Sequence, residues 1–234
     1  MREGVESETY LQWLSQAAPD VQLHHLMSGY WISAAIGVAA ELNLADLLTE
    51  GARDSTDLAR MTGTNPAALY RLLRTLASVG LFTEVEPGHF ALTEMGALLH
   101  TDHPKSLHGL TWYNCGETQW RRFGALRYSI ETGQSVDLQV FGGRMQTYWA
   151  EHPEARAIFD VAMRSTAVQV LDAVVSAYDF APFHTMVDVG GGYGAMLSAI
   201  LNRTPGLRGV LFDRPEVAEG SETASRGGRG ARPL

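Results

Sequence analysis

The sequence predicts a mainly helical N-terminal region that contains a winged helix, followed by the beginning of an α/β domain of Rossmann-like type. Three observations support this fold class. Residues 67–79 repeat leucines at helical spacing, residues 81–85 and 89–92 flank a Pro-Gly turn as two short strands would, and residues 185–201 read as strand, glycine loop and helix.

The composition is that of a globular protein with an acidic balance. The 234 residues are 45% hydrophobic and 19% charged, and the net charge of −8 argues against a nucleic-acid partner held by phosphate contacts. Cys115 is the only cysteine, which excludes an intramolecular disulfide and a cysteine-based metal site. We find neither a signal peptide nor an apolar run of the roughly 18 residues that a membrane span requires. We therefore expect no metal, no membrane partner and a cytoplasmic location.

Two helices are predicted first, over residues 8–27 and 30–48. The second has an apolar stripe from Ile32 to Leu48 that is wider than one packed face needs. We therefore expect a homodimer through residues 8–48 and the winged helix, with this stripe buried in the interface.

A winged helix is predicted over residues 54–93. Asp54 caps a short helix at 58–61, Gly63 ends it, and Asn65 with Pro66 starts the helix at 67–79. Such a shape also occurs in transcription regulators. The second helix offers only Arg71 and Arg74 to a DNA groove, so DNA binding is kept as an alternative.

Residues 94–184 are predicted to be helical. A helix capped by Thr93 is followed by helices at 114–129 and 144–149, and then by one long helix at 153–178. His100, His103 and His108 are spaced too irregularly for a metal site, and we expect them to be solvated.

The glycine loop has the composition of a nucleotide-type cofactor site. A short strand ends at Asp188, and four glycines follow within five positions, at Gly190, Gly191, Gly192 and Gly194. Glycine permits a tight turn and close approach of a ligand to the backbone, and the following helix directs free N–H groups at the loop.

Two cofactors compete for this loop, beside the possibility of an ordinary strand-to-helix turn. Gly190-x-Gly192-x-x-Ala195 satisfies the dinucleotide pattern, with Asp213 as the ribose-binding acid. The alternative is S-adenosylmethionine, because the Asp188 carboxylate would repel a pyrophosphate but suits a ligand with an ammonium and a sulfonium group. We favour S-adenosylmethionine.

Residues 188–213, with their Asp-Val-Gly-Gly-Gly-x-Gly loop and Phe-Asp-x-Pro segment, closely resemble the small-molecule O-methyltransferases of the caffeic acid and hydroxyneurosporene type. The resemblance implies an incomplete class I methyltransferase domain, preceded by a winged helix that serves dimerisation. It also implies that Gly190 and Asp213 contact the cofactor, with Asp213 on the ribose hydroxyls, and that Phe159 and Met163 line the acceptor pocket. The expected cofactor-binding residues are Asp188, Gly190, Gly191, Gly192, Gly194 and Asp213.

The chain is expected to comprise a dimerisation domain at 1–100, a helical pocket region at 101–184, the start of the methyltransferase domain at 185–220 and a disordered tail at 221–234. Members of the family continue further and carry a His-Asp-Trp segment whose histidine is the catalytic base. No histidine follows His184, so we expect that base to lie beyond the chain end and assign no catalytic residue. We interpret the Arg/Gly-rich tail as a frameshift or truncation near residue 220, with weak turnover as its consequence.

The function expected from all this is methyl transfer from S-adenosylmethionine to a small hydroxylated acceptor, aromatic or polyketide-like. Two alternatives stay open at this point. One is a catalytically inactive relic that dimerises or binds a ligand, and the other is a winged-helix transcription regulator.

Overall fold

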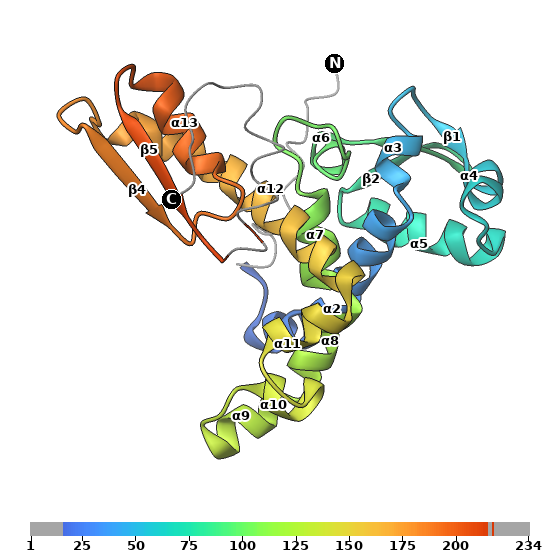
Figure 1. Ribbon diagram of the computed structural model, residues 1–234. Coiled ribbons are helices and arrows are strands. Elements are labelled where there is room, and N and C mark those ends of the chain that lie inside the picture. Colours follow the sequence, from blue (N-terminus) through green and yellow to red (C-terminus); the bar gives the residue numbers. More distant parts are fainter. Residues whose placement is uncertain (1–15, 215–216, 218–234) are drawn as a thin grey trace. The chain divides into compact units, whose positions relative to one another are not determined.

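The computed structural model describes residues 16–214 and residue 217, without the side chains of residues 167–169. The chain divides into two compact units, Met1–Ala162 and Met163–Leu234 (Figure 1). The predictions for residues 8–15 and for the tail at 221–234 lie outside the described residues.

The first unit begins with one long helix, α2 (Pro19–Glu41), and a short helix, α3 (Leu44–Leu47). The predicted division near residue 29 is wrong, because α2 continues through Gly29, and an interior glycine costs a helix only about 1 kcal/mol. The predicted helix at 30–48 instead divides at Asn43. That residue has a left-handed backbone (φ 52°), which asparagine tolerates better than most residues.

A small antiparallel sheet follows, in the strand order β1-β3-β2. Its elements are β1 (Arg53–Asp54), α4 (Ser55–Thr62), α5 (Pro66–Ser78), β2 (Phe82–Glu86) and β3 (His89–Leu92). The order helix, turn, helix and hairpin is the predicted one, and the two-residue strand β1 was missed because it is too short to show alternation. The label "winged helix" for this arrangement remains an interpretation.

Local capping sets the two helices of this region. Asp54 Oδ1 accepts hydrogen bonds from Thr56 N (2.7 Å) and Asp57 N (3.3 Å). These bonds, chiefly the one from Thr56 N, lower the pKa of Asp54. Gly63 ends α4 in a left-handed conformation, and Asn65 Oδ1 accepts from Ala68 N at 3.0 Å to start α5. These predicted caps are confirmed.

The core of the first unit lies between α2, α3, α4, α5 and the sheet. Its buried side chains include Ala39, Leu44, Leu48, Leu58, Leu69, Leu73, Leu76, Phe82 and Phe90. The apolar stripe from Ile32 to Leu48 therefore supplies this internal core, with Ala35, Ile36, Leu42 and Leu47 packed against it. The expectation that this stripe is surplus to the core is therefore wrong, whereas a dimer through residues 8–48 and the winged helix stays a prediction.

Six helices follow in the first unit. They are α6 (Glu94–Ala97), α7 (His108–Cys115), α8 (Glu117–Gly124), α9 (Leu126–Thr132), α10 (Val136–Phe141) and α11 (Met145–Glu151). The single helix predicted at 114–129 is interrupted at Gly116, whose extended backbone (φ −86°, ψ 172°) both ends α7 and starts α8. A second break, at Ala125, separates α8 from α9.

His108 is buried rather than solvated, which corrects the expectation for this histidine. Only 7% of the residue is exposed, and its Nε2 lies 2.9 Å from both Ala40 O and Asn43 Oδ1. Both partners accept, so the Nε2–H donates and joins α7 to the end of α2. Close packing of these helices also needs Gly37, where a Cβ would lie 2.7 Å from Cys115 O.

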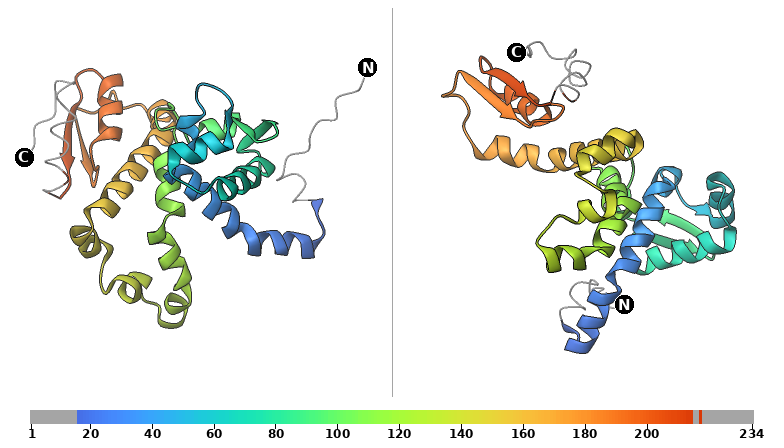
Figure 2. Two further views of the ribbon diagram at one scale, coloured as in Figure 1. Left: turned by 90° about the vertical axis from the view of Figure 1, so that its right-hand side faces the viewer. Right: turned by 60° about the horizontal axis from the view of Figure 1, so that its bottom comes forward.

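The long helix α12 (Pro153–Ala177) has the predicted extent and passes from the first unit into the second. The second unit continues with β4 (Thr185–Val189), α13 (Ala195–Arg203) and β5 (Arg208–Phe212). β4 and β5 pair in parallel with Asp188 opposite Leu211, and α13 covers one face of the pair (Figure 2). Arg203 on α13 donates to Asp172 Oδ1 of α12 at 3.2 Å.

Candidate cofactor site

The glycine loop joins the end of β4 to the start of α13. Gly190 N donates to Phe212 O at 2.7 Å, which extends the pairing with β5 by one residue. Gly194 N then donates to Gly191 O at 2.9 Å and closes a tight turn. The predicted order of strand, glycine loop and helix is confirmed.

Glycine is required in this loop for two different reasons. Gly190, Gly192 and Gly194 have φ values of +75°, +59° and +77°, which L side chains rarely adopt. At Gly191 the reason is space, because an added Cβ would lie 2.5 Å from Asp188 Oδ2 and from Leu211 Cδ1. The loop is therefore bare backbone that lies directly against the Asp188 carboxylate.

Asp213 holds this loop through its carboxylate. Its Oδ2 accepts from Gly192 N at 2.8 Å, and its Oδ1 accepts from Arg214 N at 2.7 Å. A carboxylate offers about four lone-pair sites, so each oxygen keeps capacity for a further donor such as a ribose hydroxyl. The structure thus adds a role for Asp213 that the sequence did not indicate, since it fastens the glycine loop.

Asp188 has a buried oxygen that lacks a donor. Its Oδ2 has no hydrogen-bond partner among the residues that the structure describes. Burial, and secondarily the negative charge of Asp213, raises the pKa of the Asp188 carboxyl. A cationic group beside these two carboxylates would favour the ionised form of Asp188 and offset its repulsion by Asp213. A pyrophosphate would instead add negative charge to the same place.

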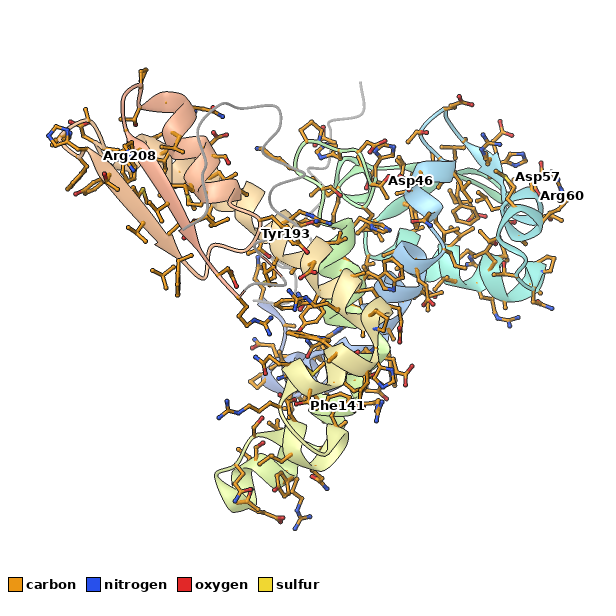
Figure 3. The ribbon with its side chains drawn as sticks, in the orientation of Figure 1. Asp46, Asp57, Arg60, Phe141, Tyr193 and Arg208 are labelled. Carbon is orange, nitrogen blue, oxygen red and sulfur yellow. The ribbon has the colours of Figure 1, made fainter. Side chains whose placement is uncertain are left out.

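The start of α13 completes the loop. Gly194 is the N-cap and offers no side-chain acceptor, so the first amides of the helix lack a side-chain cap. The Arg164 guanidinium of α12 lies over the ring of Tyr193, with Cζ 5.3 Å from the ring centroid (Figure 3 labels Tyr193). This contact was not predicted, because residues 164 and 193 are distant in sequence.

Phe159, the first of the two predicted acceptor-pocket residues, belongs to an aromatic cluster in the first unit. Its ring centroid lies 4.2 Å from that of Trp149 and 5.5 Å from that of Tyr113. Trp149 and Tyr113 also line a cavity of about 410 Å³. No periodic pattern indicated this cavity, because its walls come from four short helices. Met163 lies one turn further along α12, in the second unit, and is 40% exposed.

Two general features of the described residues bear on the site class. None of the helices in that part of the chain has both the length and the apolar content for crossing a membrane. Within the same residues, no three His, Cys, Asp or Glu side chains gather closely enough to hold a metal ion.

Comparison with known families matches most of the chain. Residues 24–102 match the O-methyltransferase dimerisation domain, and residues 123–229 match the O-methyltransferase domain. The second match contains the glycine loop and Asp213.

Curated relatives include several bacterial methyltransferases. The chain is 42% identical over 197 residues to the phenazine O-methyltransferase PhzM of Lysobacter antibioticus. This match covers 84% of this chain and 58% of the relative. It is 37% identical over 211 residues to the mitomycin biosynthesis 6-O-methyltransferase of Streptomyces lavendulae. This second match covers 88% of this chain and 59% of the relative. The chain thus spans less than two thirds of the length of these relatives.

Solved structures agree with these relatives. The crystal structure of LaPhzM superposes with a TM-score of 0.88 at 38% identity, over 93% of this chain and 66% of that one. An O-methyltransferase from neocarzinostatin biosynthesis, solved with S-adenosylmethionine and 2-hydroxy-5-methyl naphthoic acid, matches with a TM-score of 0.72 at 32% identity, over 87% and 64%. The chain described here belongs to the S-adenosylmethionine-dependent O-methyltransferases that carry an N-terminal dimerisation domain.

Proposed function

We propose that this chain binds S-adenosylmethionine at the glycine loop and serves methyl transfer to a hydroxyl group of a small aromatic acceptor. The observation that supports the proposal best is the buried, donor-less oxygen of Asp188 beside a glycine loop tied to Asp213. Relatives act on acceptors of this class, among them 3-amino-4-hydroxybenzoate and a dihydroxynaphthoate.

Each proposed site residue has a distinct task. Asp188 places a carboxylate where the cationic groups of the cofactor need one, and the loop of Gly190, Gly191, Gly192 and Gly194 lets the ligand approach the backbone. Asp213 orients the loop and keeps lone pairs for the ribose hydroxyls. The bound cofactor supplies the methyl group. Phe159 and Met163 are proposed to contact the acceptor.

We propose a homodimer whose interface, within the predicted residues 8–48, lies on the first half of α2, since the stripe from Ile32 to Leu48 packs inside the unit. Apolar side chains on this half of the helix are exposed in the single chain, from 54% at Tyr30 to 75% at Leu26. The set comprises Leu23, Leu26, Met27, Tyr30 and Trp31. Large exposed apolar patches mark contact surfaces, and the dimerisation-domain match covers these residues except Leu23.

The interface is tested by charge insertion. Leu26→Glu should convert a dimer into a monomer at tens of micromolar in light scattering, because burying an unpaired carboxylate opposes association. Glu41→Gln, at an exposed position at the end of the same helix, is the control and should leave the dimer intact. A dimer that persists in Leu26→Glu would place the interface elsewhere.

We also retain the domain division at 100, 184 and 220, a cytoplasmic location, and the absence of nucleic-acid and membrane partners as proposals. Filter binding with duplex DNA and fractionation of the producing cell test the last three. Retention of DNA at physiological salt would favour the regulator alternative.

The cofactor proposal is tested by calorimetric titration with S-adenosylhomocysteine and, separately, with NAD. S-adenosylhomocysteine should bind the more tightly. Asp213→Ala should weaken its binding by about 1–3 kcal/mol, as expected when charge-assisted hydrogen bonds are lost. Asp172→Asn is the matched control, because Asp172 lies in the same unit, its side chain is 93% exposed, and its ion pair with Arg203 is at the surface, where such pairs contribute little. Tighter binding of NAD would overturn the proposal.

A further inference from the structure

The first unit contains a cavity that the cofactor site does not use. It lies between α7, α8, α10 and α11, with a volume of about 410 Å³. Ligand pockets in proteins span roughly 300–1,000 Å³, so this cavity is large enough for a small molecule. In Figure 1 the helices α8, α10 and α11 lie together at the lower end of the first unit.

Aromatic rings form part of the cavity wall. Tyr113 comes from α7 and Trp149 from α11, and both rings pack against Phe159 on α12. Phe159 therefore contacts both rings. Rings held by a third ring present fixed faces, and fixed aromatic faces favour a flat ligand that can stack on them.

The charged residues of the wall leave it net positive. Arg122 and Asp137 pair with each other, with Arg122 Nε 2.8 Å from Asp137 Oδ1. Arg144, at the N-cap of α11, also lines the cavity, and no carboxylate among the described residues lies within ion-pair distance of it. The second arginine thus gives the cavity one positive charge that Asp137 does not balance.

The indole of Trp149 adds a second sign of an incomplete contact set. Its Nε1–H is buried and has no acceptor in the described part of the chain. A buried donor without a partner is unfavourable, and a ligand oxygen that reached this N–H would satisfy it.

From these features we infer that the cavity binds a planar aromatic carboxylate, with its ring between Tyr113 and Trp149 and its carboxylate on Arg144. A monocarboxylate matches a single unbalanced arginine, and a guanidinium binds a carboxylate through two parallel hydrogen bonds. The inference relies on the proposed function in one respect, which is that it takes this acid to be the methyl acceptor.

The test is calorimetric titration of the full 234-residue chain with 1-hydroxy-2-naphthoate and with the matched neutral 1-hydroxy-2-naphthamide. The acid should bind the wild-type chain about 10-fold more tightly than the amide. Arg144→Gln should remove this preference and leave amide binding unchanged. A loss of about 10-fold is the lower end for a charge-assisted contact, because the Arg144 side chain is partly in solvent. Arg127→Gln, at an arginine that pairs with Glu131 on α9, should change neither ligand.

A second variant locates the binding site without touching a charge. Gly143 lines the cavity, its φ is not left-handed, and a Cβ there would meet no atom within 4 Å. Gly143→Leu should therefore fold and should block both naphthalene ligands by filling the cavity. Gly124→Leu, where a Cβ also meets no atom, is the control outside the cavity.

Three results would overturn the inference: equal binding of acid and amide, an unaltered preference in Arg144→Gln, or unaltered binding in Gly143→Leu with a native circular dichroism spectrum. Titration of the same samples with S-adenosylhomocysteine separates the two proposals. If S-adenosylhomocysteine binds and the acid does not, only the cavity assignment is removed. Acid binding without binding of S-adenosylhomocysteine would remove the cofactor proposal and the role of the acid as methyl acceptor, and would leave the cavity assignment standing.

Discussion

Asp188→Asn should stabilise the second unit and weaken cofactor binding at the same time. Asp188 Oδ2 is buried without a donor among the described residues, and burial and the charge of Asp213 both disfavour the ionised carboxylate and raise its pKa. Leaving a buried polar group unpaired costs about 1–3 kcal/mol, and a neutral amide avoids the part that is due to charge. We therefore expect the free energy of unfolding to rise by about 1 kcal/mol at pH 7.

The same substitution removes the carboxylate proposed to face the cationic groups of S-adenosylmethionine. Losing one charge-assisted contact should lower the affinity by about 1.4 kcal/mol, or about 10-fold. Opposite changes in stability and binding are the signature of a residue held in a strained environment for a ligand. A residue that only packs would lose stability and leave binding unchanged.

The pH dependence follows from the raised pKa of Asp188. Because the folded-state pKa is above the unfolded value, the folded state holds the proton more tightly, and stability falls as pH rises through the folded pKa. The stability advantage of Asp188→Asn should therefore be present at pH 7 and shrink as pH falls below the raised pKa, where the wild-type carboxyl is also neutral.

The assay has to report on the second unit. All five tryptophans lie at or before Trp149, so tryptophan fluorescence follows the first unit. Hydrogen exchange of the amides in 185–212 follows the second, and calorimetry gives the affinity. Asp172→Asn is again the control. An Asp188→Asn chain that is less stable at pH 7, or that binds S-adenosylmethionine as tightly as wild type, would refute this reasoning.

Three further outcomes are expected. Gly191→Ala should destabilise the second unit by about 1–3 kcal/mol, because the added Cβ would lie 2.5 Å from Asp188 and Leu211. It should also abolish S-adenosylhomocysteine binding in calorimetry. The control Gly124→Ala, where a Cβ meets no atom within 4 Å, should bind normally. His108→Ala should lower the unfolding free energy of the first unit by about 1–3 kcal/mol, because Ala40 O and Asn43 Oδ1 lose their donor. Urea titrations followed by tryptophan fluorescence measure this change. An effect no larger than that of His103→Ala would contradict the prediction. Asp54→Ala should lower the melting midpoint of the first unit at pH 7. The difference from wild type should vanish as pH falls through the lowered pKa of Asp54, and its persistence at pH 2 would exclude the capping role.

Features that depend on neighbouring residues could be predicted from the sequence. Asp54, Gly63 and Asn65 start or end their helices through contacts within a few positions, and each acts as predicted. The strand, glycine loop and helix at 185–201 form a similar local pattern, because positive φ at Gly192 and Gly194 is required by the turn itself. The family resemblance depends on the same local residues, which is why it held.

Features that depend on distant residues were decided by the tertiary structure. The apolar periodicity of residues 32–48 showed that the stripe is buried but not by what, and the partner proved to be α4, α5 and the small sheet of the same unit. From the sequence alone, a polar residue such as His108 is expected to be exposed to solvent. Its burial is possible because Ala40 O and Asn43 Oδ1 accept from its Nε2–H, and these acceptors are brought to it only by the packing of α7 against α2. The donor-less oxygen of Asp188 and the bond from Gly192 N to Asp213 likewise arise from the pairing of β4 with β5, since burial and charge proximity are set by which segments meet in space.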